Sequence, residues 1–172
     1  MPASVTSYSY PHRQCNILTI KVAEGNKTFN SANNCNAVLR GTSIIEGSVS
    51  TIVPDNITSI DLCAFSGRKF NDTTLDLSNY KSLIVFGAYA FEGTNLVKII
   101  LPENFKSLGS ASLSTSTLKT IVSYSNYIVT ASNFPSNLVD VYVRDELVED
   151  YKQASAWSNI ADKIKPLSEY TE

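Results

Sequence analysis

The chain has 172 residues, of which 43% are hydrophobic and 17% charged, and its formal net charge at pH 7 is −2. This hydrophobic share is typical of a globular protein rather than a disordered one. The absence of a basic stripe argues against nucleic acid or an anionic membrane as a partner, and no apolar run approaches the roughly 18 residues of a membrane span.

The first segment, MPASVTSYSYPHRQ, has neither a charged n-region nor an apolar h-region, so it does not read as a signal peptide. We interpret residues 1–14 as an N-terminal tail or linker, residues 15–143 as a repeat array, and residues 168–172 as a C-terminal tail. The array begins abruptly at Cys15 without an obvious cap, whereas terminal repeats normally need one. This favours a domain cut from a longer precursor over a complete cytosolic protein.

A strand-like pattern, L-x-x-I-x-L or a close variant, recurs along the chain. Its copies are ILTIKV at 17–22, TTLDLS at 73–78, LVKIIL at 96–101, LKTIVS at 118–123 and LVDVYV at 138–143. The last part of each copy alternates inward and outward, as in a strand with one buried face. Strands this short cannot bury their own apolar face, so the copies are predicted to stack in one sheet.

A second repeat lies between these strands, with large residues at offsets 0, +3, +6 and +11. Its clearest copies are Pro54-Ile57-Ile60-Phe65, Tyr80-Leu83-Phe86-Phe91 and Pro102-Phe105-Leu108-Leu113, and Ser123-Val129-Phe134 is a weaker one. Offsets of three predict tight helical or irregular turns. The residue at +11 is predicted to be a buried plug that stacks on its counterpart in the next coil, and a fixed period of this kind is typical of a solenoid.

Residues 144–167 carry the pattern of an amphipathic helix. Its apolar positions recur mostly at spacings of three and four: Leu147, Val148, Tyr151, Ala154, Trp157, Ile160, Ala161 and Ile164. Asp145 is expected to accept hydrogen bonds from the first-turn amides, Ser155 or Ser158 is a candidate break point, and Pro166 is expected to end the helix. We predict a helical cap over the last coil.

At this level of detail the chain resembles the BspA-like leucine-rich repeats, a family of bacterial surface antigen type. The resemblance rests on LVKIILPENFKSLGSASL and IVPDNITSIDLCAFSG as repeat units, on VAEGNKTFNSANNCNAVLRG as a longer variant coil, and on VYVRDELVEDYKQASAWSNIADKIKPL as a terminal cap. Tyr80 and Ser123 depart from the family pattern by replacing its proline. The resemblance implies a bacterial cell-surface or secreted protein that acts in adhesion and protein binding, without catalysis.

Residues with catalytic or metal-binding chemistry are sparse. His12 is the only histidine and lies in the predicted tail, away from any partner motif for a triad or a zinc site. Cys15, Cys35 and Cys63 lack C-x-x-C spacing, and we interpret them as free buried thiols, with one disulfide left open. No phosphate-binding glycine motif or calcium loop occurs, and solvated surface explains the carboxylates better than a catalytic pair. We predict a non-enzyme without cofactor or metal.

The candidate binding residues lie between the inward positions of the predicted strands. One column consists of Lys21, Asp76, Ile100, Val122 and Tyr142, and a second set beside it consists of Lys98, Thr120 and Asp140. Exposed apolar side chains in one column would form a patch for a protein partner. The alternative is that β-branched residues simply suit strands.

Together these observations predict an α/β leucine-rich-repeat-like right-handed solenoid of about five coils. Short parallel strands would form one face, irregular or short helical turns the other, and a helical cap the C-terminal end. The expected function is non-catalytic recognition of a host or neighbouring-cell protein by a monomer, at the cell surface or outside the cell. Two alternatives stay open: a structural spacer or part of a surface or phage fibre, and a glycan-binding module using Tyr89, Tyr124, Tyr127 and Tyr142.

Overall fold

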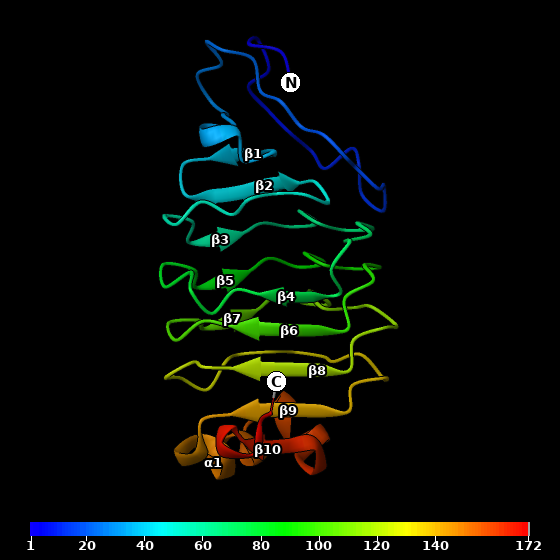
Figure 1. Ribbon diagram of the computed structural model, residues 1–172, viewed down its shortest axis with the longest axis vertical. Coiled ribbons are helices and arrows are strands. Elements are labelled where there is room, and N and C mark those ends of the chain that lie inside the picture. The colour runs from blue at the N-terminus through cyan, green and yellow to red at the C-terminus, as the bar shows by residue number, and fades with distance from the viewer. Residues whose placement is uncertain (172) are drawn as a thin grey trace.

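The computed structural model describes residues 1–171, and Glu172, the last residue of the tail expected at 168–172, lies outside them. The chain forms an elongated stack in which two five-stranded sheets run along the long axis (Figure 1). Sheet A has the order β1-β2-β3-β5-β7, and sheet B has the order β10-β9-β8-β6-β4. The prediction of a single sheet is therefore wrong, although the stacking of short strands is present.

Sheet B gathers the repeated strand pattern. Its strands are β4 (Thr74–Asp76), β6 (Lys98–Leu101), β8 (Thr120–Ser123), β9 (Asp140–Val143) and β10 (Ile164–Pro166). The pairing is parallel throughout, and the inward residues Leu75, Ile99, Ile121, Val141 and Ile164 lie side by side in that order. The alternation in the sequence thus predicted the buried face of four of these strands.

Three strands of sheet A come from segments that were expected to be turns, and its first two strands precede those segments. Its strands are β1 (Ala37–Arg40), β2 (Ser43–Gly47), β3 (Ser59–Ile60), β5 (Val85–Phe86) and β7 (Ser107–Leu108). The +6 residues of three successive repeats, Ile60, Phe86 and Leu108, are paired neighbours in this sheet. The strands β3, β5 and β7 have only two residues each, which is too short to show alternation in the sequence.

The strand predicted at residues 17–22 does not form. The segment has no regular secondary structure, and the side chain of Leu18 is 64% exposed. The side-chain amide of Asn36 bonds twice to this backbone: the Ile20 N–H donates to Asn36 Oδ1 at 2.6 Å, and Asn36 Nδ2 donates to the Leu18 carbonyl at 3.0 Å. Such local side-chain bonds compete with strand pairing, which explains the failure of the prediction.

The residues at +11 form the interior plugs that the spacing predicted, with one exception. Phe65, Phe91 and Leu113 are buried, and the rings of Phe65 and Phe91 stack with centroids 5.2 Å apart and planes 1° from parallel. Phe134 is only half-buried, and its ring lies 4.4 Å from that of Trp157. The last plug therefore packs on the C-terminal cap rather than on another coil.

The N-terminal residues lie against the first strands instead of extending away. Met1, Val5, Tyr8 and other side chains pack on a small apolar cluster around Phe29, Val38 and Ile45. The strands β1 and β2 pair in antiparallel fashion, and a short 3-10 helix, η1 (Ala32–Asn34), precedes them. This arrangement covers the N-terminal end of sheet A, for which the sequence had shown no cap (Figure 1).

The C-terminal cap is present but is not one helix. It consists of η2 (Asp145–Leu147), α1 (Val148–Gln153), η3 (Ala156–Lys163) and η4 (Leu167–Glu169). The break falls at Ala154 and Ser155, and Ser155 is one of the two expected break points. Asp145 does not cap the first turn, because its carboxylate instead accepts the Ser168 N–H at 3.0 Å. Pro166 does not end a helix either, because it belongs to strand β10.

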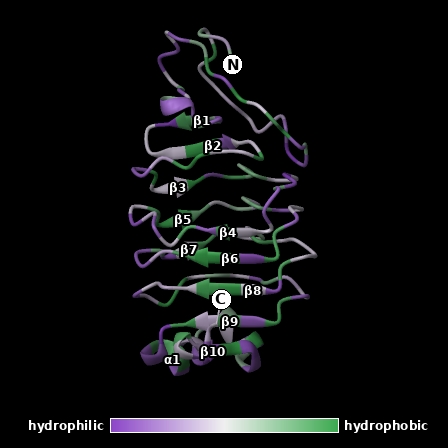
Figure 2. Ribbon diagram, in the orientation of Figure 1, coloured by the Kyte–Doolittle hydropathy of each residue, from purple (hydrophilic) through white to green (hydrophobic). Residues whose placement is uncertain are grey.

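Hydrophobic residues concentrate on the strands and hydrophilic residues on the turns at either side of the stack (Figure 2). The main core cluster runs between the sheets from Cys35 to Ile164, beside the small cluster around Phe29, Val38 and Ile45. Within residues 1–171, no helix has the length and apolar character needed to cross a membrane.

Candidate functional site

The predicted binding residues lie on the outward face of sheet B, which we call the outer face. Register places Asp76 beside Ile100, then Val122, Tyr142 and Lys165. A second column runs from Lys98 through Thr120 to Asp140. The structure thus brings seven of the eight candidates together in the order that the sequence suggested.

Lys21 is the exception. It lies in the segment that does not form a strand, and its side chain is exposed near the N-terminus. Its carbonyl accepts a hydrogen bond from the Met1 amino group at 2.5 Å. The expectation that Lys21 continues the outward column is therefore wrong, because the strand that would carry it is not part of the sheet.

Two further candidates, Ile100 and Val122, are in the column but are not displayed. Their side chains are 6% and 0% exposed. The ring of Tyr170 lies 5.2 Å from that of Tyr142 on β9, and its hydroxyl accepts a hydrogen bond from Lys98 Nζ on β6 at 3.0 Å. Because β8 lies between β6 and β9, Tyr170 crosses over β8 and shields the centre of the column.

The displayed part of the outer face is a set of alternating cations, carboxylates and aromatic rings. Lys165 Nζ lies 2.6 Å from Asp140 Oδ1 and 5.8 Å from the centre of the Tyr142 ring. The hydrogen bond to Asp140 raises the pKa of Lys165 above its ordinary value. Lys98 Nζ lies 5.4 Å from the centre of the Tyr170 ring. Cation–aromatic pairs of this type suit recognition of polar and aromatic surface groups.

The tyrosines considered for glycan binding do not gather at one place in the chain. Tyr89 lies under the guanidinium of Arg13, 4.5 Å away, in the turn after β5. Tyr127 follows β8 and stacks with Lys106 at 4.7 Å, whereas Tyr142 is part of β9. The rings of Tyr89, Tyr127 and Tyr142 thus each have a different cationic partner, and these contacts do not describe a shared aromatic groove.

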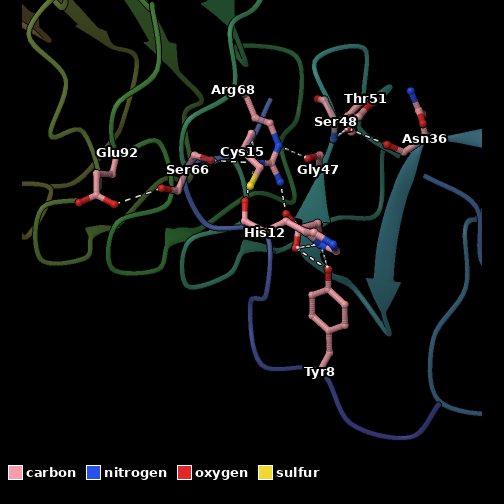
Figure 3. Close-up of polar contacts among 11 residues, drawn as sticks. Tyr8, His12, Cys15, Asn36, Gly47, Ser48, Thr51, Ser66, Arg68 and Glu92 are labelled. Carbon is pink, nitrogen blue, oxygen red and sulfur yellow. Dashed lines mark hydrogen bonds and ion pairs between the residues drawn. The ribbon is translucent and has the colours of Figure 1, made fainter. Parts of the chain in front are cut away.

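A buried ion pair lies at the other end of the molecule, at the N-terminal side of sheet A (Figure 3). Arg68 is fully buried, and its guanidinium pairs with the carboxylate of Glu46. It also donates to the carbonyls of Gly47 at 2.7 Å, of His12 at 3.2 Å and of Cys15. Removal from water lowers the pKa of Arg68 to about 10.

Two side chains of the N-terminal segment complete this cluster. The Tyr8 hydroxyl donates to Glu46 Oε2 at 2.5 Å, and His12 Nδ1 lies 3.0 Å from the same hydroxyl. Burial raises the pKa of Tyr8. The assignment of His12 to a free tail was thus wrong. The sequence did carry a signal at Glu46, a lone charge after Ile44 and Ile45, whereas Arg68 stands next to Lys69 and gave none.

The contacts of this cluster are those of a structural ion-pair network rather than of a catalytic site. Glu46 faces the cation of Arg68, and the guanidinium bonds to backbone carbonyls of the N-terminal segment. Arg13 adds two bonds of 2.8 Å to the carboxylate of Glu92. These contacts tie the N-terminal segment to two successive repeats, and a buried pair of this kind is costly to break from one side.

The cysteines are free, as interpreted, but they differ in exposure. Cys35 and Cys63 are buried, which raises the pKa of both thiols, whereas Cys15 is exposed. The prediction of burial is therefore wrong for Cys15. Residues 1–171 contain no group of three or more His, Cys, Asp or Glu side chains arranged to hold a metal ion.

Comparison with known proteins agrees with this architecture. A family model described as BspA type leucine rich repeat region matches the chain in six copies over residues 46–148. This range is more than half of the chain and includes β3 to β9. No curated protein matches the chain. The repeats, their register and the family match together show that this chain belongs to the BspA-type leucine-rich repeat family.

Proposed function

We propose that this protein is a non-catalytic recognition module at the cell surface or in the extracellular medium. In this proposal the repeats form a right-handed solenoid that binds a host or neighbouring-cell protein as a monomer. The observation that carries the proposal is the outer face, where Lys98 on β6, Asp140 and Tyr142 on β9, and Lys165 on β10 present charges and a ring from one sheet. Membership of a repeat family whose domains commonly bind proteins supports it.

A hydrogen-bonded sheet holds these side chains in place before a partner arrives. Binding then costs little conformational entropy, so more of the free energy of the contacts contributes to affinity. Tyr142 is the natural anchor, since tyrosines near the centre of an interface often carry a large part of the binding free energy. The charges of Lys98 and Asp140 at its sides are expected to act more on association rate and salt dependence.

The test is binding of the immobilised protein to a panel of purified extracellular matrix and cell-surface proteins. Tyr142→Ala is the test variant, and Tyr127→Ala is the matched control, because Tyr127 is an exposed tyrosine with its own lysine partner elsewhere. Ile100 is unsuitable for this purpose, since a charged substitution at a 6% exposed position would disturb the fold. Weaker binding by Tyr142→Ala alone supports the proposal.

Two other results would contradict it. Equal binding by the wild type and both variants would move the site away from the outer face. Failure of the wild type to bind any member of a broad panel would favour the alternative of a structural spacer or fibre component.

A further inference from the structure

The four edge strands of the two sheets differ in what pairs with, or blocks, their outer side. At the β1 edge, Asn30 and Leu39 exchange backbone hydrogen bonds of 3.0 and 2.8 Å. At the β7 edge, Ser107 forms a bridge with Thr130. At the β10 edge, Pro166 lacks an N–H and so cannot continue a ladder. Only at β4, among residues 1–171, does the sheet end without a bridge, a proline or a further strand.

The backbone of β4 has hydrogen-bonding groups that face away from the sheet. Thr73 and Leu77 use their backbone groups to bond to β6. Because successive residues of a parallel strand bond to opposite sides, Thr74 and Asp76 direct theirs away from β6. The Thr74 N–H is taken by Asp72 Oδ1 at 2.8 Å. The Thr74 carbonyl and both backbone groups of Asp76 are thus directed toward the side where another strand would lie.

The hydrophobic core is also less completely covered at β4 than at the inner strands of sheet B. In the inward column, Ile99, Ile121 and Val141 are each 0% exposed, whereas Leu75 on β4 is only half-buried. Each of the three buried residues has a strand on both sides, and Leu75 has one on a single side; Ile164, at the opposite edge, is buried because α1 lies against β10. One more inward-facing apolar side chain beside Leu75 would give it the environment of the others.

A cleft opens at this place. It has a volume of about 350 Å³ and lies between residues 49–53 and the β4 region. Its apolar lining comes from Val53, Phe65, Phe70, Leu75, Phe91 and Leu96. Its rim includes Ser50, Thr51 and Asn71, which are neutral, and Asp72, which is acidic. The cleft therefore gives access to the core directly beside the unpaired edge.

The rim also has a charge preference. Asp72 and Asp76 are both exposed, and neither carboxylate has an ion-pair partner among residues 1–171. Asp76 projects on the outward face, between the inward positions Leu75 and Leu77. A lysine or arginine on an added strand, placed outward next to Asp76, would form a favourable cross-strand pair.

We propose that the β4 edge and its cleft bind one extended strand of a partner protein, with the local pattern apolar–basic–apolar. The strand extends sheet B through the backbone of Thr74 and Asp76, places an apolar side chain in the cleft against Leu75, and sets its basic residue beside Asp76. Strand addition of this kind takes affinity from main-chain bonds and selectivity from side-chain pockets. The inference rests on the proposed protein-binding function and names a mode and a partner chemistry for it.

The test uses a fluorescent peptide with the sequence NILTIKVA, residues 16–23 of this chain, as the probe. This segment has the required pattern, Ile20-Lys21-Val22, and the strand it was predicted to form is absent from sheet B. Fluorescence anisotropy reports binding to the whole protein, and a scrambled peptide of the same composition is the control. In the unmodified protein, amide exchange at Asp76 is expected to slow when the peptide is added, because this N–H becomes the ladder donor.

Three variants separate the contributions of the Asp76 charge and of the Asp76 N–H to peptide binding. Asp76→Asn keeps the bond to the Ser78 N–H but removes the charge, and is expected to weaken peptide binding about two- to fivefold. Asp76→Pro removes the outward N–H and the side-chain bond to the Ser78 N–H but leaves the bonds to β6, and is expected to weaken peptide binding by at least about tenfold. Asp162→Asn, an exposed carboxylate in the C-terminal cap, is the matched control and is expected to bind as the wild type does.

Three results would overturn the inference. The first is no binding of the peptide, with no change in exchange at Asp76. The second is equal affinity for the native and scrambled peptides. The third is concentration-dependent self-association of the wild type that Asp76→Pro abolishes, which would make the occupant a second copy of this chain. All three leave the outer-face proposal standing, because that proposal is tested with whole partner proteins and Tyr142→Ala.

Discussion

Replacement of Phe91 by alanine tests whether the repeats are held together by their interior plugs. The Phe91 side chain is 1% exposed, stacks on Phe65 at 5.2 Å and meets the edge of Phe86 at 5.0 Å. Truncation of a buried phenylalanine costs about 3–5 kcal/mol, which includes the transfer free energy and the cavity left behind. The loss of two ring contacts places the expected value in the upper part of this range.

The assay is urea and thermal unfolding followed by circular dichroism. For a chain of this length, each kcal/mol lowers the melting temperature by about 2–4 °C, so Phe91→Ala is expected to lower it by about 6–20 °C. Phe134→Ala is the matched control, because Phe134 is half-buried against Trp157 at the end of the stack and is expected to cost less. A loss below about 1 kcal/mol for Phe91→Ala, or one no larger than that of Phe134→Ala, would refute the reasoning.

Three further predictions concern the two ends of the molecule. Glu46→Gln leaves the buried Arg68 without its counter-charge and is expected to cost about 3–5 kcal/mol in urea unfolding, whereas Arg13→Ala, which removes an exposed pair with Glu92, is expected to cost much less. Tyr151→Phe removes a hydroxyl that bonds to two backbone groups and is expected to cost about 1–3 kcal/mol. Burial raises the pKa of Tyr151, so its neutral form stabilises the fold fully below the ordinary value near 10, and this contribution is lost as pH rises from there through the raised pKa of the folded state. Unfolding scans between pH 8 and 11 are expected to show a smaller alkaline loss for Tyr151→Phe than for the wild type, and equal losses would contradict the assignment.

The strand register of sheet B was predictable because two signals agreed. Alternation within LVKIIL, LKTIVS and LVDVYV set the inward face, and the repeat spacing aligned Ile99, Ile121 and Val141. Sheet A was not predictable as a sheet, because strands of two residues are shorter than the period that reveals them. Its core residues were nevertheless identified, since Ile60 and Phe86 stood out by their spacing.

The candidate site was predictable in order but not in exposure. The repeated strand pattern placed Ile100, Val122 and Tyr142 in one column. The burial of the first two depends on Tyr170, which comes from the far end of the chain, and no local sequence pattern encodes that contact. The prediction that Lys21 belongs to this column was wrong for a similar reason. The segment around it has the strand pattern, but the side chain of Asn36 bonds to its backbone instead.

The most direct test of the recognition role is the dissociation constant of the tightest-binding protein from the panel, measured by calorimetry for the wild type, Tyr142→Ala and Tyr127→Ala. If the outer face of sheet B is the binding surface, Tyr142→Ala is expected to raise the dissociation constant by about 30-fold, the equivalent of 2 kcal/mol for an anchor residue. Tyr127→Ala is expected to stay within about twofold of the wild type, since its side chain lies outside that face. The same dissociation constant for all three proteins would contradict the account.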